Sequence, residues 1–430
     1  MKNIFNFSNE ILNLDKEAIR NLAKTFAEVD KVTEYNQQKV LKAFIDNKVS
    51  EQDFSASTGY GYDDAGRDKL DRVFAQIVGS QDSLVRFNFV NGTHALSTAL
   101  FGVLRPNDTM LSVSGKPYDT LEEVIGIRGN KGDGSLKDFG INYSQVELKD
   151  GQLDIKLIIK SMNENTKMVY VQRSKGYGTR PALTVDNIKA LCDAVHQKNK
   201  DTVVLVDNCY GEFVEELEPC DVGANLIAGS LIKNPGGGIA RCGGYIAGDK
   251  KLIELVSYRL TTQGTGREVG ATLGFNRELY MGLFSAPHVT GEALKTAIYS
   301  SYILERSGYK VSPQYNEKRT DIIQSVEFGD PDRLVSFCRG IQKGSPVDSF
   351  VTPEPWDMPG YESQVIMAAG AFTMGASIEL SCDAPIREPY IAYMQGGLNF
   401  HSAKAAVLLA VEEISRSSEF GVRKEYDDEK

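Results

Sequence analysis

The sequence predicts an α/β fold, in which a large domain with a mostly parallel sheet precedes a smaller α+β domain. Between Phe74 and Val289, short apolar runs typical of buried strands alternate with helical patterns. Strands separated by helices form parallel sheets that are covered on both faces. A long helical pattern over 291–307 follows, and then short strand-like runs and helices. This second pattern is typical of a smaller α+β domain.

The N-terminal part of the chain precedes this alternation. Over 12–48, apolar residues recur every three or four positions, which predicts two helices. The segment 58–67 breaks the periodicity with three glycines and indicates a shaped loop before another amphipathic helix. We therefore expect a helical arm with an interface loop over 1–73, the large domain over 74–289 and the small domain over 290–430.

Six apolar runs are the predicted strands of the large domain: 84–90, 109–113, 168–172, 203–207, 226–228 and 244–247. The first run leads into Asn91-Gly92-Thr93-His94, which offers the capping side chain, glycine and hydroxyl typical of a helix start. The N-terminus of a helix binds anions. In the small domain we expect strands at 321–327 and 378–382.

The composition favours a small-molecule partner. The net charge is -10 and there is no long basic run, which argues against nucleic acid or an anionic membrane as a partner. No stretch of about 18 apolar residues is present, and no secretory signal pattern. We therefore expect a cytoplasmic protein. The six cysteines form no C-x-x-C pair and the four histidines are scattered, so no metal site is expected.

Lys233 is the first candidate for chemistry. It lies between Ser230 and a glycine run, in a segment that follows a predicted strand ending in Asp207. Pyridoxal phosphate needs an amine for a Schiff base, a carboxylate opposite its ring nitrogen, and donors for its phosphate. Lys233, Asp207 and the small residues near them offer all of these, so we expect pyridoxal 5'-phosphate as the cofactor. For an isolated motif, the alternative is a solvated lysine before a turn.

The spacing of the surrounding residues favours the cofactor. Asp207-Asn-Cys-Tyr210 places a tyrosine three residues after the aspartate. Ser230 and Lys233 form S-x-x-K, and Arg241 follows the lysine by eight residues. With these motifs most of the chain, from about residue 58 to 397, resembles the fold type I pyridoxal phosphate enzymes. That superfamily includes aspartate aminotransferases and the cystathionine lyase and methionine gamma-lyase group.

The resemblance implies a role for each matching residue. Lys233 would carry the Schiff base, Asp207 would face the ring nitrogen, and Tyr210 would donate a hydrogen bond to the ring oxygen. Ser230 and Arg241 would hold the phosphate. The helix start Gly92-Thr93-His94 would contribute its N–H groups to the same phosphate.

Further ring contacts are expected from two other segments. Tyr118 follows the next predicted strand, where the lyase group carries a tyrosine that stacks on the pyridine ring; His94 is the competing candidate, and packing in the core is the alternative for Tyr118. Ser174 is a candidate for either a ring contact or a loop cap.

A narrower resemblance covers the whole chain. Gly-Tyr60-Gly-Tyr62-Asp-Asp-x-Gly-Arg67, Gln172-Arg173-Ser174 and Ile386-Arg387-x-Pro-Tyr390 are similar to local signatures of the methionine gamma-lyase-like "aluminium resistance" group of bacterial proteins. The chain departs from the lyase group at three motifs: the Y-x-R loop, the hydroxyl of S-x-T-K, and the late arginine that binds the substrate carboxylate. Arg387 and Arg173 are the substitutes that we expect for this arginine, since a guanidinium is the natural bidentate partner of a carboxylate.

Several assignments keep an alternative. Tyr62 is a candidate acid for a leaving thiolate or an aromatic residue of a subunit interface. Arg387 is a substrate ligand or a structural surface residue. The segment 264–267 is a turn or a loop that reaches a partner subunit's phosphate. Because fold type I sites are usually built at a dimer interface, the resemblance implies a homodimer or homotetramer with a shared site.

The predicted function is cleavage of a carbon–sulfur bond in an amino acid. Lys233 would remove the α-proton as general base, and β- or γ-elimination would release a thiol, ammonia and a 2-oxo acid. An aminotransferase on the same fold is the main alternative. A non-enzymatic phosphate- or dinucleotide-binding module is disfavoured, since the glycine run matches neither G-x-G-x-x-G nor a Walker loop.

Overall fold

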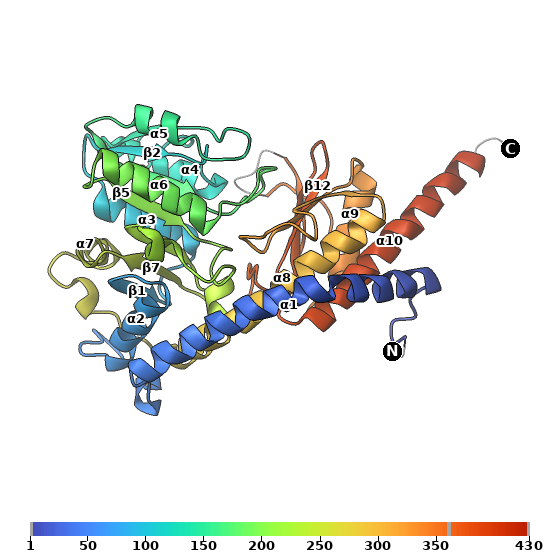
Figure 1. The fold of residues 1–430 in the computed structure, drawn as a ribbon, viewed down its shortest axis with the longest axis horizontal. Helices are drawn as coiled ribbons and strands as arrows, with labels where there is room; N and C mark the ends of the chain where they lie inside the picture. Colours follow the sequence, from blue (N-terminus) through green and yellow to red (C-terminus); the bar gives the residue numbers. More distant parts are fainter. Residues whose placement is uncertain (1–2, 359–362, 428–430) are drawn as a thin grey trace. The chain divides into compact units, whose positions relative to one another are not determined.

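The computed structural model describes residues 3–358 and 363–427 (Figure 1). It divides into two compact units, Glu34–Pro287 on the one hand and Met1–Thr33 with His288–Lys430 on the other. Two long helices, α1 (Asn9–Asp46) and α8 (Asn276–Arg306), continue from one unit into the other. The sequence placed residues 1–73 in one N-terminal arm, whereas the structure groups the first part of α1 with the C-terminal part of the chain.

Helix α1 replaces the two helices expected over 12–48, so that prediction was wrong. The stretch from Asn9 to Asp46 contains no glycine or proline to interrupt a helix. Two sets of apolar residues along it are buried in different units. Ala18 and Leu22 pack in the cluster of the C-terminal unit, and Val40 and Ala43 pack in a cluster of the other unit.

The larger unit contains a seven-stranded sheet in the order β1-β7-β6-β5-β4-β2-β3. Strand β7 is antiparallel to both neighbours and the other pairs are parallel, so the predicted mostly parallel sheet is confirmed. The strands are β1 (Asp82–Arg86), β2 (Thr109–Ser112), β3 (Asn142–Gln145), β4 (Thr166–Gln172), β5 (Val203–Asp207), β6 (Leu226–Ser230) and β7 (Gly244–Gly248).

Helices cover both faces of this sheet. Successive strand residues point to opposite faces, and Leu205 and Val206 accordingly belong to two different apolar clusters. One cluster contains residues of α2 and α6, and the other contains residues of α3, α4 and α7. The helices are α2 (Ala65–Ile77), α3 (Gly92–Val103), α4 (Asp119–Ile125), α5 (Ile155–Ser161), α6 (Val185–Lys198) and α7 (Lys250–Leu260), with short 3-10 turns η1 (Glu51–Phe54), η2 (Lys137–Phe139), η3 (Pro219–Val222), η4 (Asn234–Gly236) and η5 (Gly266–Glu268).

The C-terminal unit has a five-stranded antiparallel sheet in the order β10-β11-β12-β9-β8. This is the smaller α+β domain that the sequence predicts. Its strands are β8 (Lys310–Ser312), β9 (Gln324–Glu327), β10 (Val365–Ala368), β11 (Ser381–Pro385) and β12 (Ile391–Gln395), and its helices are α9 (Pro331–Lys343) and α10 (Phe400–Asp427). Across the part of the chain that the structure describes, no helix combines the length and apolar character needed to cross a membrane.

Candidate active site

Three chain segments meet at the carboxyl ends of β5 and β6. Asp207 is the last residue of β5 and Ser230 the last residue of β6, and these strands are parallel neighbours. Gly92, the first residue of α3, lies against the end of β6 and the turn that follows β5. A Cβ on Gly92 would be 3.4 Å from the Cys209 Sγ and 3.4 Å from the Ser230 Cβ. The anion-binding end of a helix therefore lies beside Ser230 and the turn after Asp207.

The start of α3 is held by capping contacts. The Asn91 side chain accepts a hydrogen bond from the His94 N–H at 2.8 Å, and His94 Nδ1 accepts one from the Val90 N–H at 3.1 Å. The Thr93 and Thr120 hydroxyls are 2.7 Å apart. Because Thr120 lies in the first turn of α4, this bond also links α3 to the segment that carries Tyr118.

Lys233 stands above the Tyr210 ring. Its Nζ is 3.8 Å from the ring centroid, and the residue as a whole is partly exposed. Tyr210 has a φ of 72°, in the left-handed region, within the turn that follows β5. This turn brings Tyr210 back toward Lys233, while its hydrogen bond to a cofactor oxygen stays a prediction.

Asp207 is a buried carboxyl group with few donors. Its exposed fraction is 6%; Oδ1 accepts from the Cys209 N–H at 3.1 Å, and Oδ2 accepts from the Tyr170 hydroxyl at 3.4 Å. Burial raises the pKa of Asp207, although the nearby Lys233 opposes this shift. A cationic ring nitrogen beside Asp207 would favour the carboxylate by direct charge pairing.

The charge of Lys233 depends on the same acids. Burial lowers the pKa of its ammonium, but Cys209, Tyr210, Asp207 and Glu212 together raise it by more. The amine therefore holds a proton at neutral pH in this arrangement. An amine whose charge depends on its neighbours in this way is typical of a catalytic site.

Comparison with known proteins assigns the chain to a family. The family whose sequence pattern matches the chain is Methionine gamma-lyase, over residues 11–415. The chain belongs to the methionine gamma-lyase family. Among curated proteins, the uncharacterised YnbB of Bacillus subtilis (strain 168) is 51% identical over 399 residues, which are 93% of this chain and 95% of that protein.

Solved structures agree with this assignment. A carbon-sulfur lyase involved in aluminium resistance from Clostridium novyi NT is 55% identical, with a TM-score of 0.92 over 95% of this chain and 97% of that one. A candidate cystathionine beta-lyase involved in aluminium resistance from Clostridium acetobutylicum is 52% identical, with a TM-score of 0.93 over 96% and 97%. The pyridoxal-5'-phosphate dependent protein YhfS from Escherichia coli, at 15% identity and a TM-score of 0.61 over 90% and 97%, shares the fold alone. The predicted fold type I architecture is confirmed.

Ser230 and Arg241, the two side chains predicted to bind the phosphate, differ in burial and in their partners. Ser230 is buried at the end of β6, and its hydroxyl is 3.4 Å from the Gly243 carbonyl oxygen. Arg241 is exposed instead; its Nε donates to Glu278 Oε2 at 2.8 Å and its guanidinium lies 4.9 Å from the centre of the Phe275 ring. Arg241 would have to leave Glu278 in order to bind a phosphate at Ser230.

The candidate ring contacts Tyr118, His94 and Ser174 have different surroundings. Tyr118 precedes α4, with its ring 5.9 Å from that of Tyr177. His94 packs edge-on against Phe89 at 5.6 Å, and burial lowers the pKa of its imidazole. Ser174 is buried, and its carbonyl oxygen accepts from Arg180. Tyr118 and His94 therefore stay candidates for stacking on a ring.

The surroundings of Arg173 do not support the predicted substrate contact. The side chain is fully buried, and its guanidinium donates to Asn208 Oδ1 at 2.8 Å, to the Gly211 carbonyl at 3.0 Å and to Glu215 Oε1 at 3.0 Å. Glu218 lies 3.6 Å away on the same guanidinium. This arginine fixes the turns after β5, and a substrate carboxylate would have to displace these partners.

Arg387 is exposed in the turn between β11 and β12, and it belongs to the C-terminal unit. It lines a shallow hollow of about 30 Å³ with Pro385, Glu388, Pro389, Ile391 and Tyr393. Lys233 belongs to the other unit. The role of Arg387 as a substrate ligand stays a prediction.

The backbone of the loop that carries Tyr60 and Tyr62 is held by hydrogen bonds from a buried arginine. Both rings are exposed, 73% and 59%, and they stack with centroids 5.5 Å apart. The buried Arg67 donates to the Gly61 carbonyl at 2.8 Å and to the Gly270 carbonyl at 3.0 Å. Exposed aromatic rings on a fixed backbone fit the interface that we expected here.

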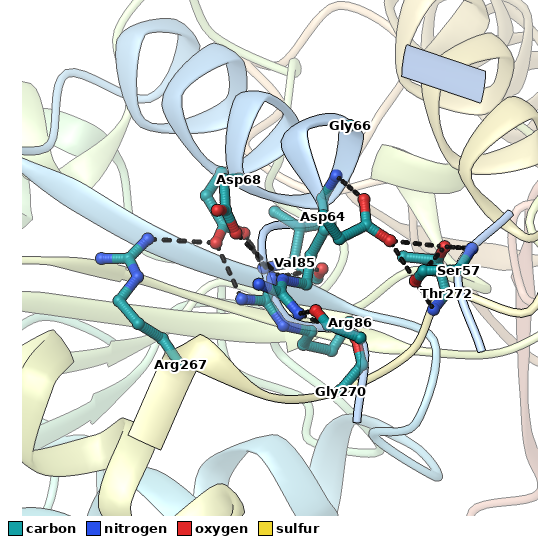
Figure 2. Close-up of polar contacts among 12 residues, drawn as sticks. Ser57, Asp64, Gly66, Asp68, Val85, Arg86, Arg267, Gly270 and Thr272 are labelled. Atoms are coloured by element: carbon teal, nitrogen blue, oxygen red, sulfur yellow. Dashed lines mark hydrogen bonds and ion pairs between the residues drawn. The ribbon is translucent and has the colours of Figure 1, made fainter. Parts of the chain in front are cut away.

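A buried charge cluster lies beside this loop (Figure 2). Asp64 accepts hydrogen bonds from Ser57 and Thr272, and Arg86 pairs with Asp71 at 2.6 Å. Arg267 pairs with Asp71 at 3.1 Å and also with Asp82. Both partners belong to the same chain and hold the segment 264–267 as a turn, while its approach to a partner subunit's phosphate stays a prediction.

Three further residues near Lys233 and Tyr210 were not predicted from the sequence. Glu212, Tyr245 and Asn234 are buried and connected to one another by hydrogen bonds. Glu212 lies two residues after Tyr210, which was the one available signal. Among the described residues, no group of three or more His, Cys, Asp or Glu side chains could hold a metal ion.

Proposed function

We propose that this chain is a pyridoxal 5'-phosphate-dependent carbon–sulfur lyase that acts on a sulfur-containing amino acid. The observation that carries the proposal is the position of Lys233, with its Nζ 3.8 Å above the Tyr210 ring and its charge coupled to Asp207. Membership of the methionine gamma-lyase family supports the same class of reaction.

The residues present fit the cofactor. The start of α3, where Gly92 lets the helix backbone lie close to Cys209 and Ser230, would offer its N–H groups to a phosphate. Asp207 offers its carboxylate for a ring nitrogen, and Tyr210 offers a hydroxyl for the ring oxygen. When bound, pyridoxal phosphate supplies an aldehyde that amines condense with and a ring that withdraws electrons from the substrate α-carbon.

The chain's own groups would then control proton movement. Lys233 would accept the α-proton of the substrate on Nζ, since it is the basic side chain nearest to Tyr210 and Asp207 in this site. Tyr118 would lie against the ring and limit its rotation. Asp207, held by the Cys209 N–H, would keep its charge directed at the ring nitrogen.

The substrate class rests on the relatives. The names of the Clostridium novyi and Clostridium acetobutylicum proteins point to a carbon–sulfur bond and to cystathionine. In this proposal Arg387 would bind the substrate carboxylate, and Tyr62 would protonate the leaving thiolate from a neighbouring subunit. The active assembly would be a homodimer or homotetramer.

The test is an amino-acid screen with the purified protein and pyridoxal phosphate. L-Cystathionine, L-cysteine and L-methionine are each added without a keto acid, and thiol and 2-oxo acid are measured. We expect both products from at least one substrate. A 2-oxo acid that forms only when a keto-acid acceptor is added would instead identify an aminotransferase and would overturn the lyase proposal.

A further inference from the structure

Glu212 is a buried carboxyl group to which the proposed chemistry gives no role. Its exposed fraction is 1%, and it lies in the turn that also carries Tyr210. Oε1 accepts a hydrogen bond from the Tyr245 hydroxyl at 2.7 Å. Oε2 is buried without a hydrogen-bond partner among the residues that the structure describes. A buried polar atom left unpaired is costly, so its retention calls for an explanation.

The sheet leaves space for this carboxyl group. Gly229 on β6 pairs in register with Tyr245 on β7. A Cβ on Gly229 would lie 2.8 Å from Glu212 Oε1 and 2.6 Å from the Tyr245 oxygen. Since side chains alternate along a strand, Gly229 and Ser230 face opposite sides of the sheet. Glu212 therefore lies across the sheet from the candidate phosphate site.

Glu212 also holds the segment of Lys233 directly. Its backbone carbonyl oxygen accepts a hydrogen bond from the Asn234 side chain at 2.9 Å. Asn234 is fully buried and follows Lys233 in the chain. The turn after β5 and the turn after β6 are thus tied together at this residue.

The charges around Glu212 come from three segments. Tyr245 donates to it from β7. Lys233 in the segment after β6, and Cys209 and Glu218 in the turns after β5, interact with it through their charges. Glu218 has Arg173 at 3.6 Å, whereas Glu212 makes no ion pair within residues 3–358 and 363–427. Burial raises the pKa of Glu212 to about 8, while the Tyr245 hydrogen bond and Lys233 oppose this shift.

We propose that Glu212 is a positioning residue for Lys233, which fixes the lysine segment through Asn234 and sets the charge of the amine through space. The inference rests on the proposed function, in which Lys233 is the amine that takes the cofactor. Glu212 and Lys233 together hold either two protons or one. When they hold one proton, either Glu212 is a carboxylate and Lys233 an ammonium, or Glu212 is a carboxylic acid and Lys233 a free amine. The titrations of the two groups are therefore coupled. Only the free amine attacks an aldehyde.

The test follows uptake of pyridoxal 5'-phosphate by the full-length apoprotein. The rate at which the cofactor absorbance develops is measured from neutral to alkaline pH for the native protein and for Glu212→Gln. Above about pH 8 the substitution removes the carboxylate that favours the ammonium. We therefore expect the midpoint of the rate profile to fall by about one pH unit, or about tenfold faster uptake between this pH and the native midpoint.

Glu215→Gln is the matched control. Glu215 lies three residues later in the same turn region and pairs with Arg173 at 3.0 Å, so its removal is expected to leave the midpoint unchanged. An unchanged midpoint in Glu212→Gln overturns the inference. A native protein that takes up no cofactor overturns the proposed function instead, so the two failures are distinguishable.

Infrared spectroscopy keeps the inference testable if Glu212→Gln does not fold. Native apoprotein at neutral pH should show the carbonyl band of a buried carboxylic acid. Tyr245→Phe removes the hydroxyl that donates to this group, so the band should change frequency in that variant. Raising the pH from neutral to alkaline should remove this band in the native apoprotein as Glu212 ionises. If no acid band that differs between the two proteins is lost over this range, Glu212 does not change its charge where Lys233 takes up the cofactor, and the inference is wrong.

Discussion

At the scale of single residues, burial decides what each charged group of the site can do. Lys233 is partly exposed, whereas Asp207 and Glu212 are 6% and 1% exposed, and burial raises the pKa of both carboxyl groups. Arg173 has the right chemistry for a carboxylate but is fully enclosed by its own partners. The same residue type can therefore be a ligand or a structural support, and the surroundings decide between these roles.

Gly229→Ala tests the close packing of Gly229 against Tyr245 and Glu212. The added Cβ would lie 2.6 Å from the Tyr245 oxygen and 2.8 Å from Glu212 Oε1, so buried groups must shift. We expect the free energy of unfolding to fall by about 1–3 kcal/mol in urea denaturation. Gly92→Ala is the control, because its new Cβ would meet neighbours at an ordinary 3.4 Å. Equal stability of the two variants would contradict this packing.

These residues also show how far the sequence predicts the site. Asp207, Tyr210, Ser230 and Lys233 were expected together because they are close in the chain, at spacings that match strand ends. The pairing of Arg241 with Glu278 joins residues 37 positions apart, and no local pattern encodes it. The burial of Arg173 likewise depends on acids more than 40 residues away, such as Glu215 at 42 positions.

At the scale of elements, the sheet and its helices follow the hydrophobic pattern closely. The predicted strands correspond to β1, β2 and β4–β7, while β3 was missed because its mostly exposed residues form no apolar run. The continuity of α1 was missed for a different reason. Its two apolar sets belong to different cores, which makes one helix resemble two when only periodicity is considered.

Ala27→Pro tests the continuity of α1. Ala27 is exposed and lies inside the helix, where proline removes a backbone hydrogen bond and clashes with the preceding turn. We expect a loss of about 3 kcal/mol in the free energy of unfolding, against about 1 kcal/mol for Ala27→Gly as control. If proline and glycine had the same small effect, α1 would be broken at this point.

The pH dependence of the free energy of unfolding tests the cap that Asp64 provides at the start of α2. It accepts from the Arg67 N–H and from Thr272, each at 2.8 Å, and from Ser57. Burial raises the pKa of Asp64, but these hydrogen bonds lower it by more, so it lies below the usual value. The carboxylate therefore stabilises the fold above the ordinary carboxyl pKa, and this contribution is lost as pH falls toward the lower, folded value.

For Asp64→Asn we expect a loss of about 1–2 kcal/mol in the free energy of unfolding at neutral pH. The difference from the native protein should shrink below about pH 4, since the native carboxyl group is then protonated. Urea denaturation at a series of pH values measures this. A difference that stays constant into acid would show that Asp64 acts without its charge.

At the scale of the whole molecule, the stacked Tyr60 and Tyr62 point to assembly. Two large rings, 73% and 59% exposed on an anchored loop, form an apolar surface that a second copy would cover in the proposed homodimer or homotetramer. We expect the double substitution Tyr60→Ser and Tyr62→Ser to shift the sedimentation profile toward a smaller species at a given concentration.

Leu157→Ser is the control for this experiment, because Leu157 is 44% exposed on α5 and belongs to no predicted interface. Its sedimentation should match that of the native protein. A native protein that sediments as a monomer at all concentrations would contradict the proposed assembly, and with it the donation of Tyr62 to a neighbouring site.

The measurement closest to the central claim is the position of covalently attached cofactor. The full-length protein is incubated with pyridoxal 5'-phosphate, reduced with borohydride, digested and analysed by mass spectrometry, with Lys233→Ala treated in parallel. We predict a phosphopyridoxyl group on the peptide that contains Lys233, and none on the corresponding peptide of the variant. An unmodified Lys233 in the native protein would contradict the account.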